Sequence, residues 1–203
     1  MIYEVIFDVE TKKIFDEIAG NDPADLGVSL VSLYRRALNE NFEEMEGKIQ
    51  SFWEEEFEKM WPIFESAQRI IGFNSLKFDV PALKPYAPSH FSKLPHFDIL
   101  QKIKEITDRR TSLNSIAKIT LGRGKTDSGL NAVTYFAKGD PESLAKLKKY
   151  CEEDVLITKD IYDFAFKNKK LKFIDHWNTL REVNLDFSYS KQDLLVPSQT
   201  SLF

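Results

Sequence analysis

The sequence predicts an α/β fold in which a mixed sheet, made of an antiparallel meander plus parallel strands, is flanked by helices. Short β-rich apolar runs come early in the chain, and helical segments dominate from Leu76 onward. With 203 residues, 42% of them hydrophobic, the chain can build one sizeable core but hardly two. We therefore expect one domain over residues 1–185 and a flexible tail over residues 186–203.

The strands are predicted from alternation and β-branched content. Ile2–Phe7 is an apolar run that ends in an acidic pair, which is typical of a buried strand with polar groups at its end. Leu26–Tyr34 alternates apolar and small polar residues, and Lys48–Trp53 is a candidate third strand of a meander. Further strands are predicted at Arg69–Phe73 and Leu171–Ile174.

Helical spacing predicts the remaining elements. Glu54–Gln68 reads as an amphipathic helix that is interrupted at Pro62. The longest helix should begin at Asp140, an N-cap residue followed by Pro141. Other helical segments are expected after Phe78, after Asp98, over Ser112–Leu121, over Leu130–Ala137 and after Ile174.

Charge and cysteine content limit the function classes. A formal net charge of -4 argues against a protein that holds nucleic acid by bulk basicity alone, although a local basic rim such as Arg109-Arg110 or Arg123–Lys125 could serve. The single cysteine, Cys151, cannot form an intrachain disulfide. The N-terminal apolar stretch is too short and acidic for a signal peptide, and no run approaches a membrane span, so we expect a cytoplasmic protein.

Acidic residues at three separate places are candidates for metal-dependent phosphodiester chemistry, which needs hard oxygen ligands around two cations. Asp8 and Glu10 lie two residues apart at the end of the first strand, so alternation points both carboxylates to one face. Asp79 lies among apolar neighbours, where a carboxylate is costly unless it is exposed, hydrogen-bonded or metal-bound.

Asp154 and Tyr150 lie one turn apart on the longest helix, on the same side. A phenol beside a metal-bound carboxylate is suited to hold the attacking water rather than to act as a base, because its ordinary pKa is about 10. Each feature alone also fits a structural role: a solvated strand end, a helix-start aspartate and a helix-edge hydrogen-bond pair. Their joint occurrence favours catalysis.

Three sequence segments carry a family resemblance. FDVET (7–11), NSLKFD (74–79) and YCEED (150–154) resemble the three exonuclease motifs of the DEDD superfamily, whose members have an RNase H-like fold. The Tyr150 spacing marks the DEDDy branch, since the histidine branch would need His where this chain has Lys149. The wider context over residues 1–174 resembles RNase H-like exonuclease domains that are sometimes fused to bacterial helicases.

This resemblance implies a 3'-5' exonuclease that uses two Mg²⁺ or Mn²⁺ ions. It implies that the metal ligands are Asp8, Glu10, Asp79 and Asp154, with Tyr150 as the water-positioning residue. Substrate contacts are expected from Thr11, Asn74 and Phe78. For Asn74 and Phe78 the alternatives are a turn residue and a core aromatic.

The C-terminal residues resemble a second known pattern. Gln199–Phe203 is similar to the pentapeptide with which bacterial proteins dock on the sliding clamp. In that case Leu202 and Phe203 would enter an apolar pocket while Gln199 hydrogen-bonds at its edge. The alternative is that Leu202 and Phe203 pack back on the domain. Tethering to a clamp would favour DNA over RNA as substrate, in replication or repair.

Two other functions remain open on the sequence. An RNase H-like endonuclease or resolvase shares the carboxylate cluster but does not require Tyr150. A non-catalytic clamp-binding adaptor would not need the intact set of four carboxylates. End-labelled substrates separate the first from an exonuclease, and metal-dependent turnover excludes the second.

Overall fold

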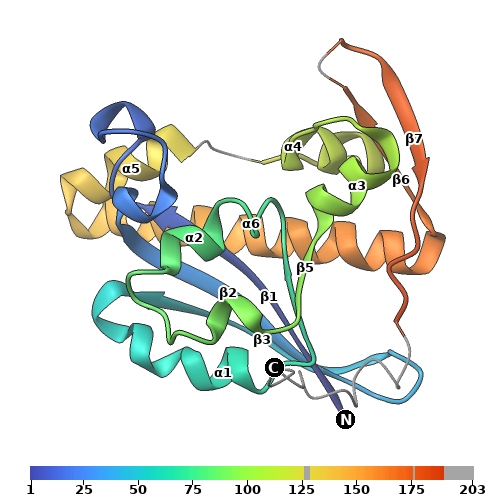
Figure 1. Cartoon of the computed structure of the whole chain (residues 1–203), viewed down its shortest axis with the longest axis horizontal. Helices are drawn as coiled ribbons and strands as arrows, with labels where there is room; N and C mark the ends of the chain where they lie inside the picture. The colour runs from blue at the N-terminus through green and yellow to red at the C-terminus, as the bar shows by residue number, and fades with distance from the viewer. Residues whose placement is uncertain (126–128, 176, 190–203) are drawn as a thin grey trace, which may run out of the picture.

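The computed structural model, which describes residues 1–125, 129–175 and 177–189, contains a five-stranded mixed sheet with helices on both faces (Figure 1). The strand order is β3-β2-β1-β4-β5. The antiparallel meander consists of β1 (Ile2–Thr11), β2 (Val28–Leu38) and β3 (Glu44–Trp53). Parallel to β1 run β4 (Arg69–Gly72) and β5 (His96–Asp98). The predicted α/β architecture is confirmed.

Alternation along β1 decides which residues face which layer. Val5, Phe7 and Val9 belong to a core cluster with α1 (Trp61–Glu65) and α2 (Asp79–Leu83). Ile6 belongs to a second core cluster on the opposite face. Because side chains two apart share a face, the acidic residues of β1 at positions 4, 8 and 10 all lie on the Ile6 face.

That second face is covered mainly by α6 (Pro141–Asn168), the longest helix, with the chain segment between β5 and α6 beside it (Figure 1). Asp140 caps it by accepting from the Ser143 amide, and Pro141 lies in its first turn, as predicted. The other helices are α3 (Ile99–Thr107), α4 (Leu113–Ile116), which continues into a π-helical turn (Ala117–Leu121), and α5 (Gly129–Lys138).

Several predicted elements differ from the structure. The 54–68 segment is not one interrupted helix: a 3-10 helix (Glu54–Lys59) precedes α1, and Pro62 lies in the first turn of α1, where its missing N–H costs nothing. The prediction of a helical piece after Ile174 is wrong, because β7 (Leu180–Asn184) pairs with β6 (Lys170–Ile174) in a separate hairpin. Short 3-10 helices also cover Phe15–Glu17, Pro23–Leu26 and Phe91–Lys93.

Packing against the domain continues after β7. Phe187 is buried and stacks on Tyr162 with ring centroids 5.7 Å apart. The Tyr189 hydroxyl donates to Glu4 at 2.6 Å. The residues expected to form the clamp-binding tail, Gln199, Leu202 and Phe203, lie outside the described part of the chain. Within the described ranges, no helix has both the length and the apolar character required to cross a bilayer.

Candidate active site

The end of β1 places two carboxylates against α6. One oxygen each of Asp8 and Glu10 lies within 4.8 Å of the other and of the Cys151 sulfur. Cys151 Sγ is 3.8 Å from Asp8 Oδ2 and is fully buried, so the helix is packed directly on this acidic pair. The strand alternation predicted for Asp8 and Glu10 thus brings both side chains to one face.

A tight loop brings Asp79 to the same place from β4. Asn74 adopts a left-handed backbone conformation with φ of 64°, which Asn tolerates better than most residues. Asp98, the N-cap of α3, accepts from the Asn74 amide at 2.9 Å and from the Leu76 amide at 3.1 Å. Buried Asp79 then accepts from the Val9 amide at 3.2 Å, which joins the loop to β1.

Asp154 and Tyr150 come from α6, and both are buried. Lys125 Nζ donates to Asp154 Oδ2 at 2.5 Å and to the Tyr150 hydroxyl at 3.2 Å. The other oxygen, Asp154 Oδ1, is buried without a hydrogen-bond partner among the described residues. A buried carboxylate oxygen in this state is costly, and it is available to a cation.

All eight domain residues singled out from the sequence line a single pocket of about 380 Å³. They are Asp8, Glu10, Thr11, Asn74, Phe78, Asp79, Tyr150 and Asp154. Phe15 packs edge-on against Phe78 with centroids 6.1 Å apart, and Leu130 on α5 is 66% exposed in the same pocket. The pocket therefore combines an acidic floor with apolar walls.

The carboxylates are held in an unfavourable electrostatic environment. Burial, then repulsion from Asp154, Asp79 and Glu10, raises the pKa of Asp8 well above its usual range. Burial and Asp154 do the same to the pKa of Glu10. Burial raises the pKa of Asp79 to about 7, although backbone amides oppose the shift. The charge that opposes these shifts at Asp8 and Glu10 is Lys125, which pairs with Asp154.

The donor set fits a hard divalent cation. Carboxylate oxygens are the ligands that Mg²⁺ and Mn²⁺ prefer, and the unpartnered Asp154 Oδ1 supplies one of them. Burial raises the pKa of the Cys151 thiol well above its usual range, so the sulfur stays protonated and is not a competing thiolate ligand. A bound cation would relieve the repulsion among the acidic groups.

Sequence reasoning did not single out Lys125, Cys151 or Phe15 as site residues. Lys125 appeared only as part of a candidate basic rim, because nothing in a Gly-containing loop shows that its side chain turns inward. Cys151 lies inside the YCEED segment, and its burial follows from the helix face that also carries Leu147 and Val155. For Phe15 the sequence holds no signal, since its position depends on the 3-10 turn at 15–17.

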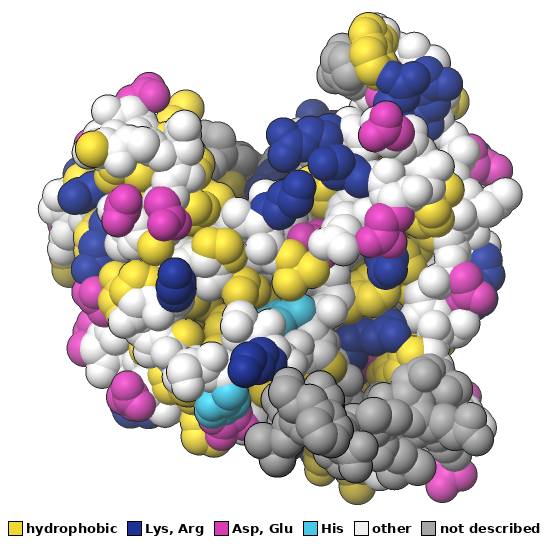
Figure 2. Space-filling model, in the orientation of Figure 1, with side chains coloured by type: hydrophobic (Ala, Val, Ile, Leu, Met, Phe, Trp, Pro, Cys, Tyr) yellow, Lys and Arg dark blue, Asp and Glu magenta, His cyan; other side chains and the backbone are white. Residues whose placement is uncertain are grey.

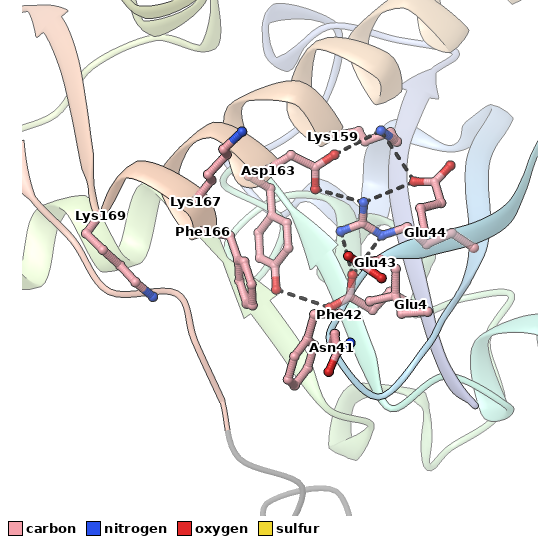
Figure 3. Close-up of a pocket in the computed structure, with 13 residues that line it drawn as sticks. Glu4, Asn41, Phe42, Glu43, Glu44, Lys159, Asp163, Phe166, Lys167 and Lys169 are labelled. Carbon is pink, nitrogen blue, oxygen red and sulfur yellow. Dashed lines mark hydrogen bonds and ion pairs between the residues drawn. The ribbon is translucent and has the colours of Figure 1, made fainter.

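A second charged cluster lies near the start of β1, and its central acidic and basic groups form ion pairs (Figure 3). Arg36 reaches Glu4 at 2.7 Å, Glu44 at 3.2 Å and Asp163 at 2.7 Å. Lys159 also pairs with Glu44 and Asp163. The second Glu4 oxygen accepts from the hydroxyl groups of Tyr162 and Tyr189. We call this group the paired cluster.

A mixed sheet whose central strand ends in clustered carboxylates defines the RNase H-like class of α/β proteins, and this class supports a nuclease-type function that uses divalent metals. The chain belongs to the RNase H superfamily, whose family model matches residues 5–166. No curated protein matches it in sequence.

Among solved structures, the chain is similar to the family B DNA polymerase from the hyperthermophilic archaeon Pyrobaculum calidifontis, with a TM-score of 0.59 and 16% sequence identity. The similarity covers 82% of this chain and 25% of the polymerase, so the chain spans about a quarter of that protein. At this identity the similarity shows the fold alone.

Proposed function

We propose that this protein is a DEDDy-type exonuclease that removes nucleotides from the 3' end of nucleic acid, with DNA favoured over RNA. Asp8, Glu10, Asp79 and Asp154 would hold two Mg²⁺ or Mn²⁺ ions. One observation carries the proposal. Carboxylates from three distant segments meet Tyr150 in one pocket, and Asp154 Oδ1 there has no partner within the described chain.

The chemistry follows from the protonation states of the side chains. When bound, the ions would polarise the phosphate and lower the pKa of water. Burial and the neighbouring carboxylates raise the pKa of Tyr150, so its hydroxyl keeps its proton and can orient water by hydrogen bonding. Lys125, which already contacts that hydroxyl, adds positive charge where negative charge would develop.

The apolar walls suit the terminal nucleotide. A base can stack on the Phe15 and Phe78 rings, and Leu130 lies in the same pocket. The Thr11 hydroxyl donates to the Lys13 carbonyl at 2.8 Å, so Thr11 holds the entrance loop as well as lining the pocket. Asn74 would contribute to substrate binding by shaping the turn that leads to Asp79. These contacts support binding of an unpaired strand end.

The test uses DNA and RNA labelled at either end, with Mg²⁺ or Mn²⁺. Stepwise release of mononucleotides from the 3' end is expected, and internal cuts would instead favour an RNase H-like endonuclease or resolvase. Asp8→Ala should abolish turnover. Tyr150→Phe should lower kcat about 100-fold while divalent-ion binding, followed by calorimetry, is retained. Full activity in Tyr150→Phe would contradict the assigned role.

Location and partners are part of the same proposal. We place the enzyme in the cytoplasm, in DNA repair or replication, with Gln199, Leu202 and Phe203 of residues 186–203 docking on the sliding clamp. A helicase acting as a separate chain would fit the resemblance. Deletion of residues 199–203 should abolish clamp pull-down and leave nuclease turnover unchanged. If turnover is absent and pull-down persists, the protein is a clamp-binding adaptor.

A further inference from the structure

A basic and aromatic surface stands beside the catalytic pocket and has no role in the site described so far. It consists of Arg109, Arg110, Lys118 and Trp177, and we call it the basic-aromatic surface. Figure 2 shows Lys and Arg side chains gathered at the edge of the hollow, on the side where Figure 1 places α3 and α4.

Trp177 is unusually exposed for its size. Its side chain is 56% accessible, and the Arg109 guanidinium lies 4.1 Å from the ring centroid. Leu180, at the start of β7, is 62% exposed. An exposed indole next to arginine is the combination on which nucleobases stack in proteins that bind single strands.

The Trp177 backbone is hydrogen-bonded to a buried aspartate. Buried Asp175 accepts from the Trp177 and Thr179 amides, each at 3.0 Å, and pairs with Arg181 at 2.9 Å. These hydrogen bonds hold the backbone at Trp177 and Thr179, so the protein loses less conformational entropy when a base stacks on the exposed ring.

The hairpin is joined to the pocket through α4. The Ser115 hydroxyl donates to the Ile174 carbonyl at 2.9 Å and accepts from the Ile174 amide at 3.0 Å. One residue earlier, Asn114 accepts from the Lys125 amide at 3.0 Å. A single short helix thus connects the Trp177 hairpin with the lysine that contacts Asp154.

Basic groups line this connection. Neither Arg110 nor Lys118 makes an ion pair within residues 1–125, 129–175 and 177–189, and both are exposed. Lys118 packs over Gly124, where a Cβ would approach its Cε to 2.7 Å, so it lies next to the segment that brings Lys125 into the pocket. Arg110 lies in the loop before α4, and Lys118 lies in the π-helical turn that follows α4.

We propose that the basic-aromatic surface binds the single strand upstream of its 3' terminus, while the terminal nucleotide occupies the carboxylate pocket. The inference rests on the proposed exonuclease function. Phosphates would meet Arg110 and Lys118, and a base would stack at Trp177. The overall negative charge of the protein then poses no difficulty, because the cations are concentrated where the strand runs.

The test measures binding without cleavage. Fluorescein-labelled oligothymidylates of 4 and 16 nucleotides are titrated in chelator at low salt, and anisotropy gives Kd. Trp177→Ala and the double variant Arg110→Ala/Lys118→Ala should each weaken binding of the longer probe about tenfold, which corresponds to the loss of one stacked base or of two phosphate contacts. The shorter probe reaches only the pocket, so the variants should bind it with the same affinity as wild type.

Three controls make the result specific. Trp177→Phe should restore most of the affinity, because a ring remains for stacking. Lys48→Ala/Lys84→Ala removes two surface cations outside this surface and should change nothing. In the Arg110→Ala/Lys118→Ala variant, the slope of log Kd against log salt should fall by roughly 0.7 for each lost contact.

Several outcomes would overturn the inference. They are unchanged affinity of Trp177→Ala for the longer probe, equal losses for both probes, or no binding by wild type. A shift of Trp177→Ala from dimer to monomer in sedimentation, with binding unchanged, would identify the surface as a self-association face. Because no cleavage is required, failure of the exonuclease proposal would appear separately, as binding without metal-dependent turnover.

Discussion

Acidic residues at the two ends of β1 have opposite electrostatic environments. At the start of β1, Glu4 and its neighbours Glu44 and Asp163 face Arg36 and Lys159, so three negative charges meet two positive ones. At the other end, Asp8, Glu10, Asp79 and Asp154 share a pocket with Lys125, which pairs with Asp154, and with Lys13 at its lining. Both groups lie on the α6 face, about four strand residues or 13 Å apart.

The effect on protonation differs accordingly. In the paired cluster, burial of Glu44 is outweighed by hydrogen bonds from Tyr34 and by Lys159, and its pKa is lowered. In the candidate active-site pocket, burial and repulsion raise the pKa of Asp8 and Glu10. Charges that are paired within the chain stabilise the fold, whereas the under-compensated carboxylates support the proposed binding of an external cation.

The largest effect on turnover is expected from substitution of a proposed metal ligand at the end of β1. Asp8→Asn should lower turnover by about 10³-fold or more, since even the outer partners of metal ligands are worth about 10–100-fold. The metal-free variant should nevertheless melt at a higher temperature than wild type at pH 8, because one repelling charge is gone. Thermal unfolding in chelator measures this, and a lower melting temperature would mean that Asp8 is structural.

The reverse pattern is expected at the paired cluster. Glu4→Gln leaves Arg36 buried without its main partner and should cost about 3 kcal/mol of unfolding free energy. Turnover per folded molecule should stay close to wild type. Urea unfolding would measure the loss of stability, and an assay run 20 °C below the melting temperature of the variant would measure turnover. A loss of activity without a loss of stability would contradict the difference between the two ends of β1.

Stability of the metal-free protein should fall as the pH rises. The pKa of Asp79 is raised to about 7 from 3.8, so between these values the folded state binds its proton more tightly than the unfolded chain does. This contribution is present below about pH 4 and lost as the pH passes about 7. The melting temperature in chelator should drop between pH 5 and 8, and added Mn²⁺ should remove most of the drop.

The smallest effect concerns Lys125, the lysine that pairs with Asp154 in the pocket. Lys125→Met removes the ammonium that contacts Asp154, so Mn²⁺ should bind roughly fivefold more tightly by calorimetry while turnover falls. Lys125→Arg keeps the charge and serves as the control. Weaker metal binding in Lys125→Met would show that the lysine supports the metal site rather than competing for it.

Much of the sheet was predictable because its strands are long and patterned. The meander follows from alternation in β1 and β2, and the start of α6 from the Asp140-Pro141 cap. β5 has three residues, too few for a period to emerge. β7 was predicted as helix, because Leu180–Asn184 has no clear alternation and its pairing with β6 is a tertiary contact.

The candidate site residues that lie in the three sequence motifs could be predicted. The spacing of Asp8 and Glu10 on a strand, and of Tyr150 and Asp154 on a helix, fixes which side chains share a face. Lys125 could not be found in this way, since its inward direction depends on contacts with α4. The paired cluster also escaped notice, because a lone Glu4 in a strand shows nothing of Arg36 until the β2 register is known.

The packing of α6 on β1 imposes a length constraint on the chain. Cys151 contacts Asp8 and Tyr162 contacts Glu4, so eleven helix residues, about 16 Å, run along four strand residues, about 13 Å. One extra residue inserted between these two helix positions would rotate the following part of the helix by about 100°. Only one of the two contacts with β1 could then be kept. This stretch should accept changes of side chain far more readily than changes of length.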